Sequence, residues 1–431
     1  MGSLKFEVEW EDPLAARGQE LRATWASLRI LVDNQPVTRV EDSRSGSVRS
    51  HLHLPLYPLA EWLAANWWSL LAEIPPDREP QPGFHRRHNL RFAREGYALP
   101  NLSFIPAGER TTLVWKPESI PQTDVAFLSE GSALLDSTLV RDELASLVET
   151  VIGRLDDRGL HETPLQQDWA AIRDAEPEEA EFCRLAARLG LDPYDLSDEM
   201  QSELIEVAGR IPHSLHEEFF AAANPTQLRA QVESLNDSLG VIRSMDSRLP
   251  ELDSLRRALD RPLNGSSWEQ GYSTAREVRS LLHADSRLIP THEALMNVLR
   301  VDPEIWAGAV TMPRTVQPFS SLMAMNASRS PGFVVPLRPE EAWRFELCRV
   351  LFEFLSADKP EVAIATRTRS ERQKRNRAFA AEFLAPAGLI RERLPDECVG
   401  EDDITDIAQE FGVSPFVIRH QIENHGLAQV S

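Results

Sequence analysis

The stretch RFELCRVLFEFL, residues 344–355, decides the fold of the C-terminal part of this chain. Its apolar residues recur at intervals of three and four, which is typical of a helix with a buried face. Arg349 and Glu353 interrupt this apolar pattern with charge. Because they are four residues apart, they lie on one side of the helix and can pair with each other.

Two histidines at this spacing hold zinc in the HExxH motif of metallopeptidases, where the glutamate beside the first histidine is the general base. His-Glu pairs occur at His161, His216 and His292, but none has a second histidine at the required position. The cysteines, Cys183, Cys348 and Cys398, form no CxxC pair. The sequence therefore predicts no zinc site of either kind.

The order of three segments in the C-terminal third carries a further signal. Arg344, Phe345 and Leu347 open the quoted helix, RNRAFAAEFLAP follows at residues 375–386, and DDITDIAQEFGVSPFVIRHQIENHGL follows at residues 402–427. In order and spacing these segments resemble the ImmA/IrrE family of metallopeptidase domains. The resemblance implies a zincin-like domain with a helix-turn-helix-like tail over residues 286–431.

The resemblance also implies where the functional residues of the family would fall. The two ligands on the first helix fall on Arg349 and Glu353, the general base on Val350, and the third ligand on Arg375. Valine cannot accept a proton, and arginine cannot bind a cation because it stays protonated. We therefore expect no catalytic residue, no metal and no cofactor, so that protease activity is not supported.

At the same positions we expect an ion cluster of Arg349, Glu353 and Arg375 that ties the two helices together where zinc would be. Its charges sum to +1, as would those of Zn²⁺ with two neutral histidines and one glutamate. The alternative is that these positions face solvent in a shallow groove.

The whole chain is expected to be α+β, predominantly helical, in three regions. Residues 1–158 alternate strand-like and helix-like stretches and predict a mixed α/β domain, residues 159–285 predict a helical region, and residues 286–431 form the metallopeptidase-like domain. In the first region we expect strands over residues 4–10, 26–33, 89–96, 102–107 and 111–117. We also expect helices over 58–74, with its tryptophans in the core, and over 132–155.

The composition is that of a globular protein with a strongly acidic balance. The chain has 431 residues, 42% of them hydrophobic, and a formal charge of −21. No apolar run approaches the roughly 20 residues that span a bilayer, and the first residues lack the apolar core of a signal peptide. We therefore expect a cytoplasmic protein with no membrane contact, and the charge argues against a surface that coats nucleic acid.

Two local basic segments are exceptions to this acidic balance. Residues 367–377 carry Arg367, Arg369, Arg372, Lys374 and Arg377 among their basic side chains, and residues 84–94 read as a loop that leads into a strand. Either segment could contact phosphate or an acidic partner. The competing interpretation is a solvated loop whose charge is balanced by acids elsewhere in the chain.

The tail has the shape of a helix-turn-helix, with Gly412 in the turn and Ser414 as the cap of the second helix. Its second helix offers few side chains that read bases, so we expect the tail to pack on the rest of the domain.

Together these features predict a non-catalytic regulatory or protein-binding protein built on an inactivated metallopeptidase-like domain. By analogy with the family it would be a subunit of a bacterial defence, stress-response or mobile-element regulatory assembly. One alternative is a nucleic-acid-binding component that uses residues 84–94 and 367–377. A second alternative is an enzyme with an unrecognised site in the N-terminal domain.

Overall fold

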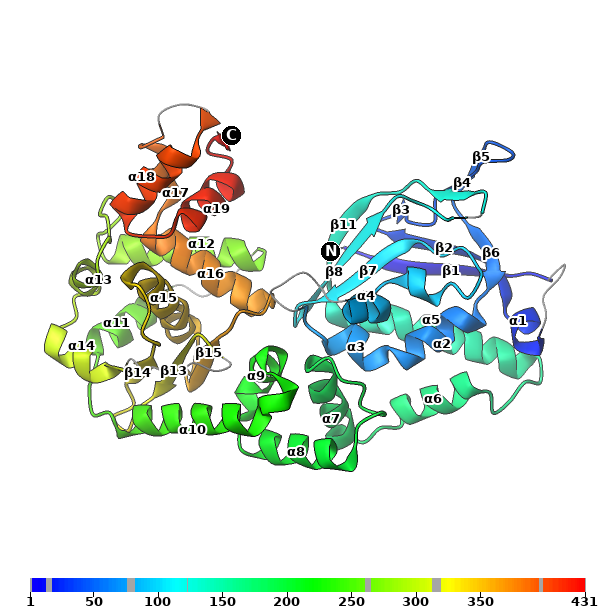
Figure 1. Cartoon of the computed structure of the whole chain (residues 1–431), viewed down its shortest axis with the longest axis horizontal. Coiled ribbons are helices and arrows are strands. Elements are labelled where there is room, and N and C mark those ends of the chain that lie inside the picture. The colour runs from blue at the N-terminus through cyan, green and yellow to red at the C-terminus, as the bar shows by residue number, and fades with distance from the viewer. Residues whose placement is uncertain are drawn as a thin grey trace. The chain divides into compact units, whose positions relative to one another are not determined.

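The computed structural model describes residues 2–12, 18–75, 82–121, 123–259, 265–311, 319–394 and 398–430. Helices and several small sheets alternate along the chain, so the expected α+β class is confirmed (Figure 1). The chain divides into two compact units, Met1–Leu204 and Ile205–Ser431. In the described part of the chain, no helix combines the length and apolarity needed to cross a membrane.

Three antiparallel sheets form the strand part of the N-terminal unit. In the first, β2 (Trp25–Val32) pairs with β1 (Leu4–Trp10), β3 (Gln35–Pro36) and β6 (Leu52–Pro55). The second has the order β5 (Ser47–Arg49), β4 (Val40–Asp42), β10 (Val125–Phe127), β9 (Glu118–Ser119). The third has the order β11 (Gly131–Asp136), β8 (Arg110–Lys116), β7 (Asn101–Pro106).

The helices of this unit are α1 (Gln19–Ala23), α2 (Tyr57–Ala65), α3 (Trp67–Ala72), α4 (Pro82–His88), α5 (Ser137–Asp157), α6 (Pro164–Arg173) and α7 (Pro177–Arg188). A single core joins them to the sheets. Helix α5 contributes a stripe at helical spacing, including Val140, Leu144 and Val151, all fully buried. Trp67 and Trp68 are buried in the same core, as expected.

Most of the strands expected in the first region are confirmed, but the one over residues 89–96 is wrong. That segment contains a short 3-10 helix, η1 (Leu90–Ala93), preceded by α4. The side chain of Asn89 accepts a hydrogen bond from the backbone N–H of Arg91, which closes a turn where a strand would have to stay extended. The helix expected from residue 132 begins only at Ser137, because β11 pairs with β8 and Asp136 then caps α5.

The expected helical region 159–285 contributes side chains to the cores of both units. Leu165 and Trp169 on α6 and Cys183 on α7 belong to the core of the N-terminal unit. Leu252 and Val278, farther along the chain, belong to the core of the C-terminal unit. The boundary between the units falls inside α8 (Asp198–Gly209).

The C-terminal unit surrounds a four-stranded sheet with the order β12 (Val310–Thr311), β14 (Pro331–Val334), β13 (Ser321–Met325), β15 (Val362–Ala365). Within the described residues of this sheet, β12 and β14 pair in parallel, and the other two pairs are antiparallel. Side chains on both faces of β13 and β14 are buried, so both faces of these strands are covered. Helix α15 (Glu340–Ser356) and helix α10 (Leu228–Ser244) both pack against these two strands.

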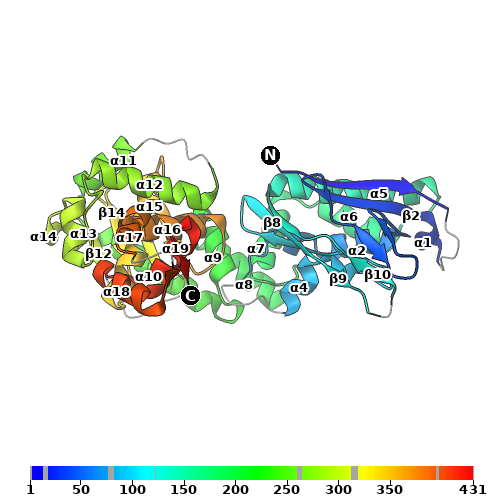
Figure 2. The same ribbon diagram turned by 90° about the horizontal axis from the view of Figure 1, so that it is seen from above.

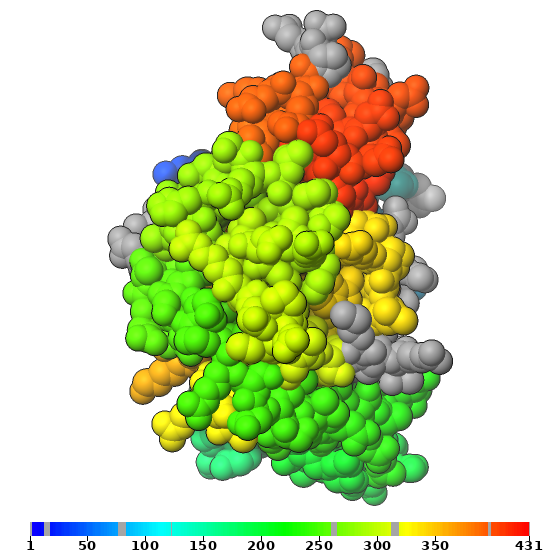
Figure 3. Space-filling view, turned by 90° about the vertical axis from the view of Figure 1, so that its left-hand side faces the viewer, coloured from blue at the N-terminus to red at the C-terminus, as the bar shows by residue number. Residues whose placement is uncertain are grey.

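The remaining helices of this unit are α9 (His216–Ala222), α11 (Pro250–Ala258), α12 (Ser267–Leu281), α13 (His292–Leu299), α14 (Pro303–Ala309), α16 (Glu371–Leu384), α17 (Ala387–Arg391), α18 (Glu401–Phe411) and α19 (Pro415–His425). Two short strands, β16 (Cys398–Val399) and β17 (Gln429–Val430), pair with each other near the end of the chain. Helix α16 packs against both α12 and α15, and the three lie together in Figures 1 and 2. On the face drawn in Figure 3, the yellow-green segment that contains α13 and α14 lies between the orange and red C-terminal segment and the green segment that contains α10.

Candidate functional site

Helix α15 carries three of the four positions that correspond to zinc-site residues in the resemblance. Arg349 is 2% exposed, Glu353 is 4% exposed and Val350 between them is fully buried. The helix is enclosed because it packs on the sheet along one side and on α11 and α16 along others. The alternative that these positions face solvent in a groove is therefore wrong for α15.

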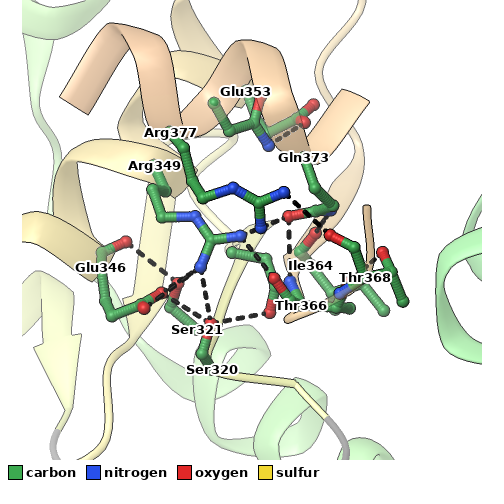
Figure 4. A network of polar contacts seen from close by, with 12 residues as sticks. Ser320, Ser321, Glu346, Arg349, Glu353, Ile364, Thr366, Thr368, Gln373 and Arg377 are labelled. Carbon is green, nitrogen blue, oxygen red and sulfur yellow. Dashed lines mark hydrogen bonds and ion pairs between the residues drawn. The ribbon is translucent and has the colours of Figure 1, made fainter. Parts of the chain in front are cut away.

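Arg349 is held by a network of oxygen acceptors (Figure 4). Its Nη1 donates to Glu346 Oε2 at 2.8 Å and to Ser320 Oγ at 3.1 Å. Its Nη2 donates to the backbone carbonyl of Thr366 at 2.5 Å and to Gln373 Oε1 at 2.6 Å. The guanidinium therefore joins α15 to β13, to the segment after β15 and to the first turn of α16.

Glu353 is paired with a different arginine, on α16. Arg372 Nε and Nη2 donate to the two oxygens of Glu353, each at 2.8 Å, and Asn376 Nδ2 donates to Oε1 at 2.6 Å. Burial raises the pKa of Glu353, but the charges of Arg372 and Arg375 and the hydrogen bonds outweigh it and hold that pKa below its ordinary value. A bidentate pair of this kind is among the stronger ionic contacts in proteins.

The expected cluster of Arg349, Glu353 and Arg375 is therefore wrong in its pairing. Arg349 reaches back three residues to Glu346, because long side chains on a helix lean toward its N-terminus. Arg375 contributes charge near Glu353, but its guanidinium lies 5.4 Å from the ring centroid of Phe352. The two helices are tied together by an ion pair, as expected, but Arg372 supplies its cation.

Sequence reasoning missed Arg372 and Asn376 as partners of Glu353, because it carried a single position, Arg375, across from the family. A signal was present in the spacing: residues 372 and 376 are four apart and share one face of α16, the face that meets α15.

These residues do not fit a zinc ion. Arg349 and Arg375 offer no lone pair to a metal at any accessible pH. Both oxygens of Glu353 already accept hydrogen bonds from α16. Structural and catalytic zinc sites need at least three protein ligands, and these positions supply one carboxylate at most.

A second buried carboxylate, that of Glu218 on α9, extends the network to the residues between β15 and α16. It accepts hydrogen bonds from Ser370 Oγ at 2.5 Å, Thr368 Oγ1 at 3.2 Å and Thr366 Oγ1 at 3.3 Å. Burial raises the pKa of Glu218 above its ordinary value. This role was not predictable from the sequence, because the hydroxyl groups at residues 366–370 lie far along the chain from Glu218.

The basic segment 367–377 is largely used inside its own unit. Arg372 pairs with Glu353, Lys374 pairs with Glu371 at 2.7 Å, and Arg377 Nη2 donates to the backbone carbonyl of Thr368 at 2.9 Å. Arg367 and Arg369 are exposed. Much of the charge that suggested a phosphate contact is therefore balanced by the domain itself.

The basic segment 84–94 is balanced in the same way by acids of the N-terminal unit. Arg87 and the buried His88 both contact Glu73, at 2.5 Å and 3.0 Å. Arg94 contacts Glu118 at 2.6 Å.

The helix-turn-helix tail packs into the core of the C-terminal unit, as expected. Ile418 and Ile422 of α19 are fully buried there, and Gln421 Nε2 donates to Glu382 Oε2 at 2.8 Å. Arg344 of α15 donates to the backbone carbonyls of Ile289 and Gly412, which fixes the turn between α18 and α19.

Comparison with protein-family models gives no match, and comparison with curated proteins gives none. The resemblance to ImmA/IrrE domains therefore rests on the order and spacing of the sequence segments.

Proposed function

We propose that this chain is a non-catalytic, protein-binding regulator built on a metallopeptidase-like domain that cannot hold zinc. The observation that carries the proposal is the ion pair between Glu353 and Arg372. It occupies both oxygens of the one carboxylate left at the expected zinc site and keeps that carboxylate buried.

Hydrolysis of a peptide bond by a zinc enzyme needs an ordered metal with an open position and a base that takes the proton from its water. At the general-base position stands Val350, which is fully buried in the core and has no group that titrates. A structural ion pair at this place keeps the helix packing that the metal would otherwise support. With the fold kept but without a metal or a base, the domain can still recognise another protein, and we propose that this is its activity.

The C-terminal unit also presents large apolar side chains to solvent, among them Leu337, Trp268 and Phe416. Such side chains, when grouped, mark interaction surfaces. By analogy with the family, we propose a partner within a bacterial defence, stress-response or mobile-element regulatory assembly.

The first test measures zinc. The purified full chain is loaded with zinc, dialysed and analysed for metal, beside the variant Glu353→Ala. We expect well below one zinc per chain in both proteins. One zinc per chain in the unmodified protein, lost in the variant, would overturn the proposal.

The second test measures binding and cleavage together. A protein that co-purifies with the tagged full chain from its natural host is itself purified, and the two are mixed and analysed by sedimentation. We expect a complex of fixed stoichiometry in which the partner keeps its mass. Cleavage of the partner that stops when a chelator is added contradicts the proposal.

A further inference from the structure

A pocket of about 580 Å³ lies in the C-terminal unit between α12 and the end of α19. One face of α12 supplies Trp268, Glu269, Tyr272 and Arg276, which follow one another at helical spacing. Asn424 and His425 close the other side. The pocket lies away from the α15 positions discussed above, and neither the resemblance nor the ion network uses it.

Arg276 is fixed in this pocket by a buried carboxylate. Its Nε donates to Glu382 Oε1 at 2.8 Å, and Glu382 is itself held by Gln421 Nε2 at 2.8 Å and by the backbone N–H of Ala387 at 3.2 Å. The side chain of Arg276 is 56% exposed while that of Glu382 is 2% exposed. The buried acid thus orients the guanidinium and leaves its Nη donors on the accessible side, where a planar fork suits a carboxylate.

The charge at this end of the pocket favours an anion. Two guanidinium groups, those of Arg276 and Arg391, lower the pKa of His425, while the single carboxylate of Glu382 raises it. Burial is the main cause that lowers the pKa of His425 below its ordinary value, and the two arginines add to it. His425 therefore serves as an uncharged ring at neutral pH, with its centroid 4.5 Å from that of Tyr272.

Aromatic groups and an acid line the rest of the pocket. Trp268 is 44% exposed, which leaves much of an indole ring in contact with water. The hydroxyl of Tyr272 accepts a hydrogen bond from Asn424 Nδ2 at 3.1 Å. Glu269 lies seven residues before Arg276 on α12, about 10 Å away along the helix axis. Hydrogen bonds from Ser266 lower the pKa of Glu269, so it is an anion at neutral pH.

We propose that this pocket binds the free C-terminus of a partner polypeptide. The terminal carboxylate forms an ion pair with the guanidinium of Arg276. The last side chain, aromatic or large and apolar, packs against Trp268 and Tyr272. The carboxylate of Glu269 accepts a hydrogen bond from a backbone N–H of the peptide. This inference rests on the proposed protein-binding function and names the chemistry of the partner.

A peptide end suits the pocket better than a nucleotide does. It brings one negative charge to the arginine and N–H donors to the acid, over a length of two or three residues. A nucleotide with its phosphate on Arg276 would bring a second negative charge close to Glu382.

The test uses fluorescein-labelled hexapeptides in which Ser-Gly-Ser-Ala-Ala precedes each of the twenty residues in turn. Each peptide is made as a free acid and as a C-terminal amide, and binding to the full chain is followed by anisotropy. We expect free acids with an aromatic or large apolar last residue to bind, and their amides to bind at least about tenfold more weakly. Equal binding of acids and amides, or no binding by any free acid, overturns the proposal.

Two variants and one control locate the binding. Trp268→Ala removes an exposed ring and Arg276→Gln removes the cation, and each should weaken the best free acid by about tenfold or more. Phe416→Ala removes another exposed ring of the same unit, 67% exposed, and should change binding by less than about twofold. Because Arg276→Gln leaves Glu382 without a cation and could affect folding, unchanged binding by Trp268→Ala is by itself sufficient to overturn the proposal.

Adenosine monophosphate serves as the competing small anion. If it binds in this pocket with loss in Trp268→Ala while no peptide does, the site belongs to a nucleotide and the proposal fails. A stable complex with a partner that persists when every peptide fails would leave the protein-binding function standing and remove only this pocket.

Discussion

At the scale of the residue, the C-terminal unit buries several charged side chains. Arg349, Glu353 and Glu218 are each less than 5% exposed, and each reaches its partners across several elements. Burying a charge is costly unless it is hydrogen-bonded and paired. Arg349 and Glu353 are each hydrogen-bonded and ion-paired, and Glu218 is hydrogen-bonded to three hydroxyl groups, so the network specifies how α9, α15 and α16 meet.

The ion pair of Glu353 yields a stability prediction. Replacing Glu353 with Ala leaves Arg372 and Asn376 without their acceptor, and we expect a loss of about 3 kcal/mol in the free energy of unfolding. Urea titration measures it. Glu341→Ala, at an exposed position on the same helix, is the control and should cost less than about 1 kcal/mol. Equal effects of the two substitutions would contradict a paired, buried Glu353.

Glu218 yields a prediction of pH dependence. Burial holds its pKa above the ordinary value of 4.5, so its ionisation is less favourable in the folded protein than in the unfolded chain. The stability that it contributes is complete below the unfolded pKa and is lost as the pH rises through the folded pKa. Glutamine does not titrate. We therefore expect the stability of Glu218→Gln relative to the unmodified protein to increase with pH above 4.5.

Urea titration of both proteins across that pH range measures this difference. Glu341→Gln, which removes a charge from an exposed position, is the control and should show no comparable trend. If the stability of Glu218→Gln relative to the unmodified protein stays constant or falls as the pH rises, the carboxyl of Glu218 is not shielded from water in the folded protein.

At the scale of the element, the turn at Gly412 sets how α18 and α19 follow each other in the tail. Gly412 ends α18 with φ of +63°, and a Cβ there would collide with the backbone carbonyl of Pro290 and with Arg344 Nη2. Gly426 ends α19 with φ of +57°, and nothing lies within 4 Å of the position of its Cβ. The two glycines therefore share a backbone conformation and differ in their surroundings.

We expect Gly426→Ala to cost about 1 kcal/mol, the strain of alanine in the left-handed region. Gly412→Ala should cost about 1–3 kcal/mol more, because the added methyl group displaces the contact between Arg344 and the turn. Thermal unfolding of both variants gives the comparison. If they are equally stable, Arg344 does not fix the tail.

The elements also show which signals in a sequence carry over to structure. The strands at residues 4–10 and 102–107 were predictable because side chains alternate between the core and the solvent, and the structure confirms them. The strand expected at 89–96 was wrong because the side chain of Asn89 accepts a hydrogen bond from the backbone N–H of Arg91, which closes a turn there. Apolar alternation cannot detect a contact of this kind.

At the scale of the whole molecule, each unit has a large hydrophobic core among its described residues. The N-terminal unit has its own buried acid, Glu73, which forms an ion pair with Arg87 and contacts His88. Burial raises the pKa of Glu73, but the hydrogen bonds and charges of those two partners outweigh it and lower that pKa below its ordinary value. Compact units with separate cores can unfold separately.

We therefore expect calorimetry of the full chain to resolve two transitions. Glu73→Gln should lower one transition and Glu353→Ala the other, because each substitution disrupts a buried ion pair in a different core. The two single variants are controls for each other. Variants that shift both transitions by the same amount would show that the two units unfold as one.

The sequence by itself determined the α+β class, the helices at residues 344–355 and 375–384, and the residue types at positions 349, 350 and 375, none of which can bind a metal, since these depend on periodicity and on which atoms a residue type offers. Only the tertiary structure decided the partners: that Arg372 pairs with Glu353, that Glu218 meets the hydroxyls of residues 366–370, and that α6 and α7 join the core of the N-terminal unit while α11 and α12 join that of the C-terminal unit. The physical reason is that helical spacing fixes which face a side chain occupies, whereas a charge buried between elements takes the nearest group that satisfies it, and that group comes from a distant part of the chain.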